Sequence, residues 1–439
     1  MSQGSVAKGE ERLFEVGELT RVEGEGSLRL RVRDGKVLEA KLGIFETPRY
    51  FEQLVGGRTP DEVIDIVARI CGICPVAYQM SAVHAFEDLF GVHIDPSVRA
   101  LRRLFYCGEW IESHALHIYL LHAPDFLGYE SAIAMAADHR QAVEMALKMK
   151  KAGNGLVKIL GGRPIHPVSV RVGGWSRVPR IAELREHRTA LAEGLELALE
   201  TVRFTSALTM PAFDREPRLV SLRHAAEYPF NDGHIVSSDG IDVPPPDWRE
   251  AFEEFQVEHS HALHSKARTG KGAYLLGPAA RVTLAGAQLH PVAREALAAT
   301  GMADLIRTNI YASIVARAVE LTHAFAEAID LIDGYRPPSE PKVAWSSRPG
   351  VAAWATEAPR GLLFHRYEVD EAGRVRAAQI VPPTAQNQAA IEADLVTAAG
   401  GVLDLPHAEA TVRLEQMIRS YDPCISCATH FLDLSIEEA

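Results

Sequence analysis

Two Cys-x-x-Cys pairs stand near opposite ends of the chain. Cys71 and Cys74 lie in the stretch RICGIC, and Cys424 and Cys427 lie in DPCISCATH. Four thiolates form a soft donor set that suits zinc, an iron–sulfur cluster or a nickel-type centre. The pairs are 350 positions apart, whereas a small structural zinc motif places its pairs roughly 12–20 residues apart. We therefore expect the fold to close around a metal, although either pair alone is compatible with a catalytic, a structural or an incidental role.

Length and composition describe an ordinary globular chain. Its 439 residues are 47% hydrophobic, which allows a large core, and its net charge is −12. A net negative charge disfavours binding to nucleic acid, which requires a basic surface. The sequence contains no run of about 18 apolar residues, so we expect no membrane span. The N-terminus shows no signal-peptide pattern. The five cysteines resemble ligands in a reducing compartment, so we expect a cytoplasmic protein.

Hydrophobic periodicity predicts a mainly α chain with small β parts, an α+β fold in which a long-helix bundle forms the core and β-hairpins lie at the periphery. A hairpin is expected around Asp34-Gly35 within 12–45, and two strands over 362–369 and 375–381. Helices are expected over 75–91, 97–123, 131–160, 179–208, 303–332, 387–399 and 407–420. The chain 1–439 is interpreted as a single domain made of the 12–45 hairpin, a bundle over 60–335, a metal-binding segment over 355–430 and a tail over 431–439.

Three histidines, His114, His117 and His122, share the helix expected over 97–123. At these spacings two of them could share a helix face and suggest a metal site. Satisfied histidines of a buried bundle are the better interpretation.

Four motifs together point to one protein family. RVEGEG at 21–26, RICGIC, EAPRG at 357–361 and DPCISCATH occur in the order found in the large, catalytic subunit of nickel–iron hydrogenases, which this chain resembles. The resemblance runs from about residue 12 to the C-terminus. It is greatest to the cytoplasmic branch linked to soluble cofactors, which includes NAD(P)-linked enzymes and sulfhydrogenases. It implies the hydrogenase large-subunit fold and reversible heterolytic cleavage of H2 to protons and electrons.

The resemblance also implies how the four cysteines are used. Cys71 and Cys424 would be terminal nickel ligands, and Cys74 and Cys427 would bridge nickel to an iron that carries one CO and two cyanides. Heterolytic cleavage requires a Lewis-acidic metal and an adjacent base. In this family the base is the thiolate that aligns with Cys424, and Glu23 would take the proton from it.

Further residues around this centre follow from the same resemblance. Arg360 would lie over the metals and act electrostatically, since guanidinium is almost never deprotonated, and Asp422 would hydrogen-bond near it. Leu363 would pack against the diatomic ligands. Pro382 and Thr384 belong to the segment that contacts the second cyanide, where Pro383 occupies the usual donor position and cannot donate, so that Thr384 would substitute. Tyr78 stands where many members of the family carry a histidine beside the metal centre.

A second ion site is also implied. Glu52, the main-chain carbonyl of Gln379 and His430 would bind Mg²⁺, or Fe in its place, through hard ligands. The alternative for Glu52 is a surface ion pair with Arg49, and the matching spacing to Cys71 favours the metal role.

The resemblance implies several partners. Because the chain has no cysteine motif beyond the two pairs, electrons would leave through iron–sulfur clusters on a small subunit, and from there through flavin-containing diaphorase subunits to NAD(P). A nickel-insertion chaperone and a maturation endopeptidase that removes 431–439 would act before the enzyme is active; read alone, those residues resemble a frayed acidic tail. Two other interpretations remain, a zinc-stapled helical protein without catalytic activity and a quinone-module subunit of a respiratory complex.

Overall fold

The fold is described from a computed structural model that covers residues 11–34, 36–47, 49–270 and 272–429. The α-helices are α1 (Phe51–Leu54), α2 (Pro60–Val67), α3 (Pro75–Phe90), α4 (Pro96–Leu116), α5 (Ala123–Leu127), α6 (Ala132–Met135), α7 (Arg140–Gly161), α8 (Ile181–Ser206), α9 (Trp248–Ala251), α10 (Pro278–Ala285), α11 (Pro291–Thr300), α12 (Ala303–Thr308), α13 (Ser313–Asp333), α14 (Pro383–Ala399) and α15 (His407–Ser420). A π-helical segment, η1 (His117–His122), joins α4 to α5, and short 3₁₀ turns occupy η2 (Pro245–Asp247), η3 (Gly286–Gln288), η4 (Ile310–Ala312) and η5 (Ile425–Ala428).

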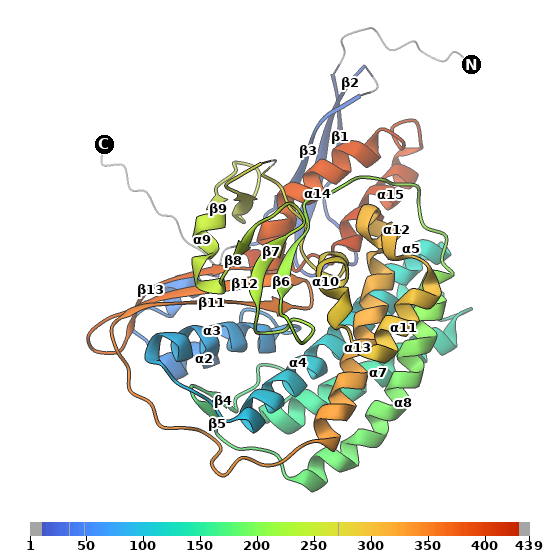
Figure 1. The fold of residues 1–439 in the computed structure, drawn as a ribbon. Helices are drawn as coiled ribbons and strands as arrows, with labels where there is room; N and C mark the ends of the chain where they lie inside the picture. The colour runs from blue at the N-terminus through green and yellow to red at the C-terminus, as the bar shows by residue number, and fades with distance from the viewer. Residues whose placement is uncertain (1–10, 35, 48, 271, 430–439) are drawn as a thin grey trace, which may run out of the picture.

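The strands form small antiparallel sheets, which lie outside the helical bundle (Figure 1). They are β1 (Glu11–Val16), β2 (Gly26–Arg33), β3 (Lys36–Ile44), β4 (Val170–Arg171), β5 (Gly174–Trp175), β6 (Val220–Arg223), β7 (His234–Ser237), β8 (Asp242–Val243), β9 (Phe252–Phe255), β10 (His264–Ala267), β11 (Gly350–Ala358), β12 (Gly361–Val369) and β13 (Val375–Val381). The sheet orders are β1-β2-β3, β4-β5, β6-β7-β8, β10-β9 and β11-β12-β13. The architecture is therefore α+β, as predicted.

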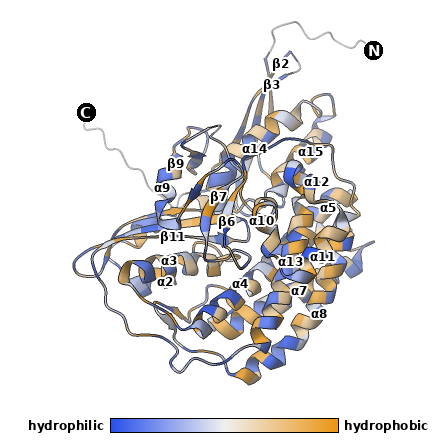
Figure 2. Ribbon diagram, in the orientation of Figure 1, coloured by the Kyte–Doolittle hydropathy of each residue, from blue (hydrophilic) through white to orange (hydrophobic). Residues whose placement is uncertain are grey.

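Four long helices form the bundle. Helix α4 packs against α7 and α13, and α8 packs against α13 and α7; these helices gather on one side of the molecule in Figure 1, and their ribbons carry both apolar and polar residues in Figure 2. The α4–α7 contact depends on glycine, because a Cβ at Gly153 would lie 2.6 Å from the carbonyl oxygen of Gly108. Core residues from Val16 to Cys427 belong to one hydrophobic cluster. Residues from both ends of the described chain thus pack into the same hydrophobic core.

Several predicted elements are confirmed and several boundaries were wrong. The hairpin at Asp34-Gly35 and the strands over 362–369 and 375–381 are present, but β1 and β11 each add a third strand that the sequence pattern did not reveal. The helix predicted over 97–123 changes to π geometry at His117. The helices predicted over 131–160 and 303–332 are interrupted, the first between α6 and α7 and the second at Asn309, whose side chain caps the next turn. Apolar periodicity continues through such breaks, so it cannot locate them.

Local signals explain how the cysteine pairs are placed. Pro75, at the first position of α3, follows Cys74, and proline is favoured where a helix begins because its missing N–H has no partner there. α15 ends at Ser420, four residues before Cys424. α3 packs on β11 and β12, and α14 packs on β3 and β10. Within the described residues, no helix combines the length and the apolarity needed to cross a bilayer.

Candidate metal centre

The four cysteines of the two pairs come together in the interior. Their sulfur atoms all lie within 4.8 Å of one another, with Sγ–Sγ distances of 3.6 Å for Cys71–Cys424, 4.0 Å for Cys74–Cys427 and 2.9 Å for Cys424–Cys427. The Cys71 sulfur also accepts the backbone N–H groups of Ile73 and Cys74, at 3.3 and 3.2 Å. All four side chains are buried. This arrangement is a tetrathiolate pocket formed by segments from opposite ends of the chain.

Without a metal, three of these four thiols resist ionisation. Burial also disfavours the Cys71 thiolate, but hydrogen bonds from the other cysteines, that of Cys424 first, lower the pKa of Cys71 below its ordinary value. Contact with Cys427 raises the pKa of the Cys424 thiol, and burial raises the pKa of the Cys427 thiol. Burial without a compensating cation disfavours the thiolate. A bound cation reverses this balance because metal binding displaces thiol protons. The electrostatics of the pocket therefore fit a metal centre.

A carboxylate lies beside the second cysteine pair. Glu23 Oε2 is 3.1 Å from Cys424 Sγ and accepts the Ser426 N–H at 3.0 Å. The backbones also meet, since the Ile425 N–H donates to the Glu23 carbonyl at 2.9 Å. Gly24 permits this approach, because at its φ of +88° a Cβ would lie 2.7 Å from the Ile425 Cβ. Glycine at this position thus lets the Glu23 segment approach the second cysteine pair closely.

An arginine pairs with the residue that precedes the second cysteine pair. Arg360 Nε donates to the Asp422 carbonyl at 2.8 Å, and Nη2 lies 3.1 Å from Asp422 Oδ1. Nη1 is buried and has no hydrogen-bond partner among the described residues. Burial disfavours the guanidinium charge, but Asp422 and then Cys424 raise the pKa of Arg360 above its ordinary value. Arg360 is therefore a fixed cation with one free donor beside the sulfur cluster.

The start of α14 approaches the same cluster. Thr384 Oγ1 accepts the Cys424 N–H at 2.9 Å, and a hydroxyl that accepts one hydrogen bond still has its own hydrogen to donate. Pro382 precedes the helix at its N-cap. Leu363 is buried on β12, three residues after Arg360. Pro383 occupies the first position of α14 and cannot donate, which leaves Thr384 as the hydroxyl in this segment.

Glu52 belongs to a second polar cluster. Its Oε1 accepts the Ile380 N–H at 2.6 Å, and the neighbouring Gln379 side chain donates to Glu254 Oε2 at 2.8 Å. Burial raises the pKa of Glu52 to about 8 and that of Glu254 to about 7. A bound cation would favour the charged forms of these two buried carboxylates. Sequence analysis missed Glu254, because in the short strand β9 it looks like an exposed strand carboxylate.

The third ligand predicted for the second ion site, His430, falls outside the described residues. His430 is not described, but Thr429 is, and its carbonyl accepts the Arg49 N–H at 2.6 Å. The Arg49 side chain donates to the carbonyls of Ile70 and Ser426. The chain before His430 thus lies against the segment that leads to Glu52. The tail 431–439 also lies outside the described residues.

Tyr78 and the three histidines take different positions. The Tyr78 hydroxyl is buried without a hydrogen-bond partner among the described residues, and burial and the charge of Cys427 raise its pKa. His114 lies 3.0 Å from Glu320, His117 hydrogen-bonds the Arg419 carbonyl at 2.7 Å, and His122 contacts Ser420 at 3.2 Å. These histidines are buried, partnered residues of the bundle, as predicted. Tyr78, in contrast, faces the charge of the sulfur cluster.

One more buried arginine supports the loop that carries Arg360. Arg281 forms a two-bond fork to Glu320 at 2.7 and 2.8 Å and donates to Glu357 at 2.8 Å. It also donates to the carbonyls of Ala358 and Pro359, at 2.9 and 2.8 Å. No motif marks Arg281 in the sequence, because its partners lie 39 to 78 positions away.

Comparison with known proteins agrees with this geometry. The sequence pattern of the nickel-dependent hydrogenase family matches residues 49–156 and 273–430. Sulfhydrogenase 1 subunit alpha of Pyrococcus furiosus is 35% identical over 428 residues, 95% of this chain and 98% of the relative, and sulfhydrogenase 2 subunit alpha of the same organism is 33% identical over 432 residues, 96% and 100% of the two chains. A crystal structure of an NAD⁺-reducing nickel–iron hydrogenase in the H2-reduced state superposes with a TM-score of 0.87 at 25% identity, covering 96% of this chain and 100% of that one. The chain therefore belongs to the nickel-dependent hydrogenase family, as one of its large, catalytic subunits.

Proposed function

We propose that this catalytic subunit cleaves H2 reversibly at a nickel–iron centre held by Cys71, Cys74, Cys424 and Cys427. The observation that carries the proposal is the juxtaposition of a buried tetrathiolate pocket with the Glu23 carboxylate, 3.1 Å from Cys424 Sγ. When bound, the metal pair supplies the Lewis acidity that heterolytic cleavage requires. A structural zinc site would account for the four cysteines, but it would not account for the Glu23 carboxylate beside Cys424.

The residues of the chain supply the proton path. The Cys424 sulfur takes the proton and passes it to Glu23 Oε2 across a contact that is already within hydrogen-bond reach. The Ser426 N–H, which also donates to Oε2, holds the carboxylate in that orientation. Proton transfer therefore requires no rearrangement of the backbone.

Free donors of the pocket suit small anionic ligands. Arg360 Nη1, which has no hydrogen-bond partner among the described residues, and the Thr384 hydroxyl are the donors that would hold two cyanides on the iron. Asp422 fixes the guanidinium through its carbonyl and its carboxylate. Leu363 and Pro382 would provide apolar surface for the diatomic ligands. Cys71 and Cys424 would be terminal nickel ligands, and Cys74 and Cys427 would bridge the metals.

We assign a Mg²⁺ ion, or Fe in its place, to the second cluster. Glu52, the Gln379 carbonyl and His430 would be its protein ligands, with Glu254 close by. The raised pKa of Glu52, about 8, supports the assignment, because a bound cation stabilises the charged carboxylate that burial disfavours.

Partners and processing complete the proposal. The chain 1–439 would act as one catalytic unit, and an iron–sulfur small subunit would carry electrons to flavin-containing subunits and NAD(P), as the NAD⁺-reducing structural relative suggests. A nickel-insertion chaperone and an endopeptidase that removes 431–439 would act during maturation in the cytoplasm. A tailed protein with full hydrogen-cleaving activity would contradict the processing step.

Infrared spectroscopy of the anaerobically purified complex tests the proposal. One carbonyl and two cyanide bands are expected in the region where metal-bound diatomic ligands absorb, because a zinc site has no absorption there. A blank region from protein already processed after His430, together with stoichiometric zinc, would overturn it. Nickel and iron contents measured on the same sample distinguish an immature precursor from a zinc protein.

A further inference from the structure

A second group of metal-type ligands lies apart from the cysteines. In the described part of the chain, only two sets of three or more His, Cys, Asp or Glu side chains bring their ligand atoms within 4.8 Å of one another. One is the tetrathiolate pocket. The other consists of His259, His264 and Glu392, and nothing in the hydrogenase reaction accounts for it.

Three different elements deliver these side chains. His259 lies in the loop after β9, His264 begins β10, and Glu392 lies on α14. His259 Nε2 is 2.7 Å from Glu392 Oε1, and His264 Nδ1 is 4.0 Å from Glu392 Oε2. Each histidine thus faces a different oxygen of one carboxylate. A tetrahedral Zn²⁺ with bonds of about 2.0–2.1 Å places its ligand atoms about 3.3 Å apart, and the observed separations lie on either side of that value.

The surroundings hold these ligands in place. The Leu42 N–H donates to Glu392 Oε1 at 2.9 Å, which leaves Oε2 without that constraint. Gln388, one turn before Glu392, donates to the Leu263 carbonyl at 2.9 Å and accepts from Ser260 at 3.2 Å. The loop between the two histidines is therefore tied to α14. Ligands fixed by such outer contacts bind metals with less loss of side-chain entropy.

The charges at this site suit one cation. The His264 side chain is buried, and those of His259 and Glu392 are half-buried. Glu392 supplies the negative charge. Lys41 also acts electrostatically on Glu392, and it is paired with Glu39 at 3.2 Å. A divalent ion would thus meet one carboxylate and two imidazoles, with the neighbouring lysine already paired to Glu39.

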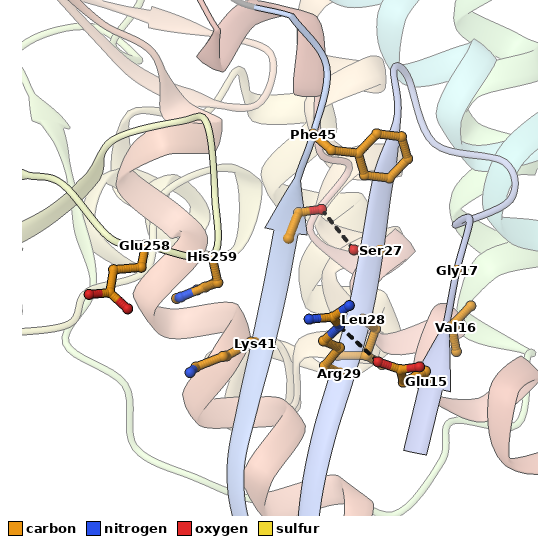
Figure 3. A pocket seen from close by; sticks show the side chains of 11 residues that line it. Glu15, Val16, Gly17, Ser27, Leu28, Arg29, Lys41, Phe45, Glu258 and His259 are labelled. Carbon is orange, nitrogen blue, oxygen red and sulfur yellow. Dashed lines mark hydrogen bonds and ion pairs between the residues drawn. The ribbon is translucent and has the colours of Figure 1, made fainter. Parts of the chain in front are cut away.

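One side of the group opens to solvent. His259 lines a cavity of about 490 Å³, together with Glu258, Lys41, Phe45, Ser27 and Arg29. Figure 3 shows His259 and Lys41 together on one side of β3. An ion held by three protein ligands would keep a coordination position for water on that side. Two histidines and one carboxylate with one open position are the donor set of many catalytic zinc sites.

We propose that His259, His264 and Glu392 bind a divalent transition-metal ion of the Zn²⁺ type, with water in the open position toward the cavity. The site joins β10 and α14 to the end of β3, where the His261 N–H already donates to the Ile44 carbonyl at 2.7 Å. It is independent of the nickel–iron centre and shares no ligand with it. Imidazole and carboxylate donors favour such an ion over Mg²⁺.

Metal uptake by the intact complex tests the site. The complex, with its catalytic centre loaded, is treated with a mild chelator and titrated with Zn²⁺, and separately with Co²⁺ as a visible-absorption probe, in excess Mg²⁺ so that oxygen-ligand sites stay filled. The wild-type complex should take up one ion more per chain than the His259→Gln or Glu392→Gln complex, and bound Co²⁺ should give the intense band of a low-coordinate site. Loss of a direct ligand should weaken binding by more than the 10- to 100-fold, roughly, that loss of an outer contact costs.

His261→Gln is the matched control. His261 lies two positions from His259 on the same loop, but it is exposed and hydrogen-bonds the Glu46 carbonyl instead of Glu392. It should bind the ion as the wild type does, and all three variants should retain hydrogen uptake, which reports an intact fold. The assignment would be overturned if the wild-type complex bound no additional metal ion. It would also be overturned if His261→Gln weakened metal binding as much as His259→Gln and Glu392→Gln do, or if neither of those two variants changed it.

Discussion

Replacing Arg281 should show how the chain holds Arg360 over the metal pocket. The Arg281 guanidinium makes five hydrogen bonds, three to Glu320 and Glu357 and two to the carbonyls of Ala358 and Pro359, directly before Arg360. It also lies 4.3 Å from the Trp110 ring centroid. Arg281 and both carboxylates have fully buried side chains. Arg281→Met therefore removes the cation of this group from two buried acids and two buried carbonyls. Glu320 keeps the Tyr228 hydroxyl at 2.7 Å, and Glu357 keeps the Leu222 N–H at 2.7 Å.

The expected cost follows from that burial. Removing one partner of a buried ion pair costs about 3–5 kcal/mol, because the remaining charge is left desolvated and uncompensated. Arg188 is the matched control, since it makes the same two-bond fork to Asp333 at 2.6 Å for both bonds, with side-chain exposures of 39% and 51%. An exposed pair of this kind contributes about 0–1 kcal/mol. Arg188→Met should therefore be nearly neutral.

Urea denaturation of the metal-loaded complex measures how much unfolding free energy each variant loses relative to the wild type. The comparison is valid when the slopes of the unfolding transitions agree. Hydrogen uptake measures the effect of Arg281→Met on the position of Arg360. A displacement of about 1 Å at a catalytic group can cost about 100-fold in rate. Arg281→Lys should recover part of the stability but little of the rate, since an ammonium has three donors and no fork. If Arg281→Met is as stable and as active as Arg188→Met, the support assigned to this arginine is wrong.

Further predictions concern the proton path, the sulfur cluster, the second ion and pH. Glu23→Gln should lower hydrogen uptake by about 10²–10⁴-fold at unchanged nickel content, because an amide cannot relay the proton; normal turnover would exclude the proposed path. Tyr78→Phe tests whether the phenol, which has no hydrogen-bond partner among the described residues, donates to a thiolate of the proposed metal centre: loss of such a donor would leave more electron density on the metals and should move the carbonyl band to lower wavenumber, whereas an unmoved band would show that the phenol makes no such bond. Glu52→Gln should lose the stoichiometric Mg²⁺ or Fe in metal analysis of the purified complex, whereas full retention would remove Glu52 from that site. Burial raises the pKa of Glu320, but Arg281 outweighs burial and lowers that pKa to about 2. The Arg281–Glu320 pair therefore contributes its full stability above the unfolded-state pKa of Glu320, near 4.5, and this contribution is lost as the pH falls toward 2. The difference in stability between wild type and Arg281→Met should thus narrow as the pH is lowered from about 5. A constant gap over that range in denaturation experiments would contradict the ion-pair assignment.

Sequence reasoning located the chemistry where local pattern encodes it. The four cysteines follow from residue type and spacing, the start of α3 follows from Pro75, and the start of α2 follows from the Thr59 cap with its reciprocal Glu62 contact. Asp34-Gly35 likewise marks the first hairpin. In each case the determining interaction joins residues a few positions apart, so the printed sequence contains it.

The tertiary structure decided the interactions between distant segments. The approach of Glu23 to Cys424 spans 401 positions, and the fork of Arg281 and the pairing of His259 with Glu392 span 39 and 133. The burial of Glu52, which disfavours the alternative of a surface ion pair, and its grouping with Glu254 come from the packing, and burial raises the pKa of both carboxyls. The sequence by itself determined which ligands and caps the chain carries. Only the packing of α14, β3, β10 and the bundle determined which of them meet and how far each is removed from water, because desolvation and long-range contact are properties of the folded chain.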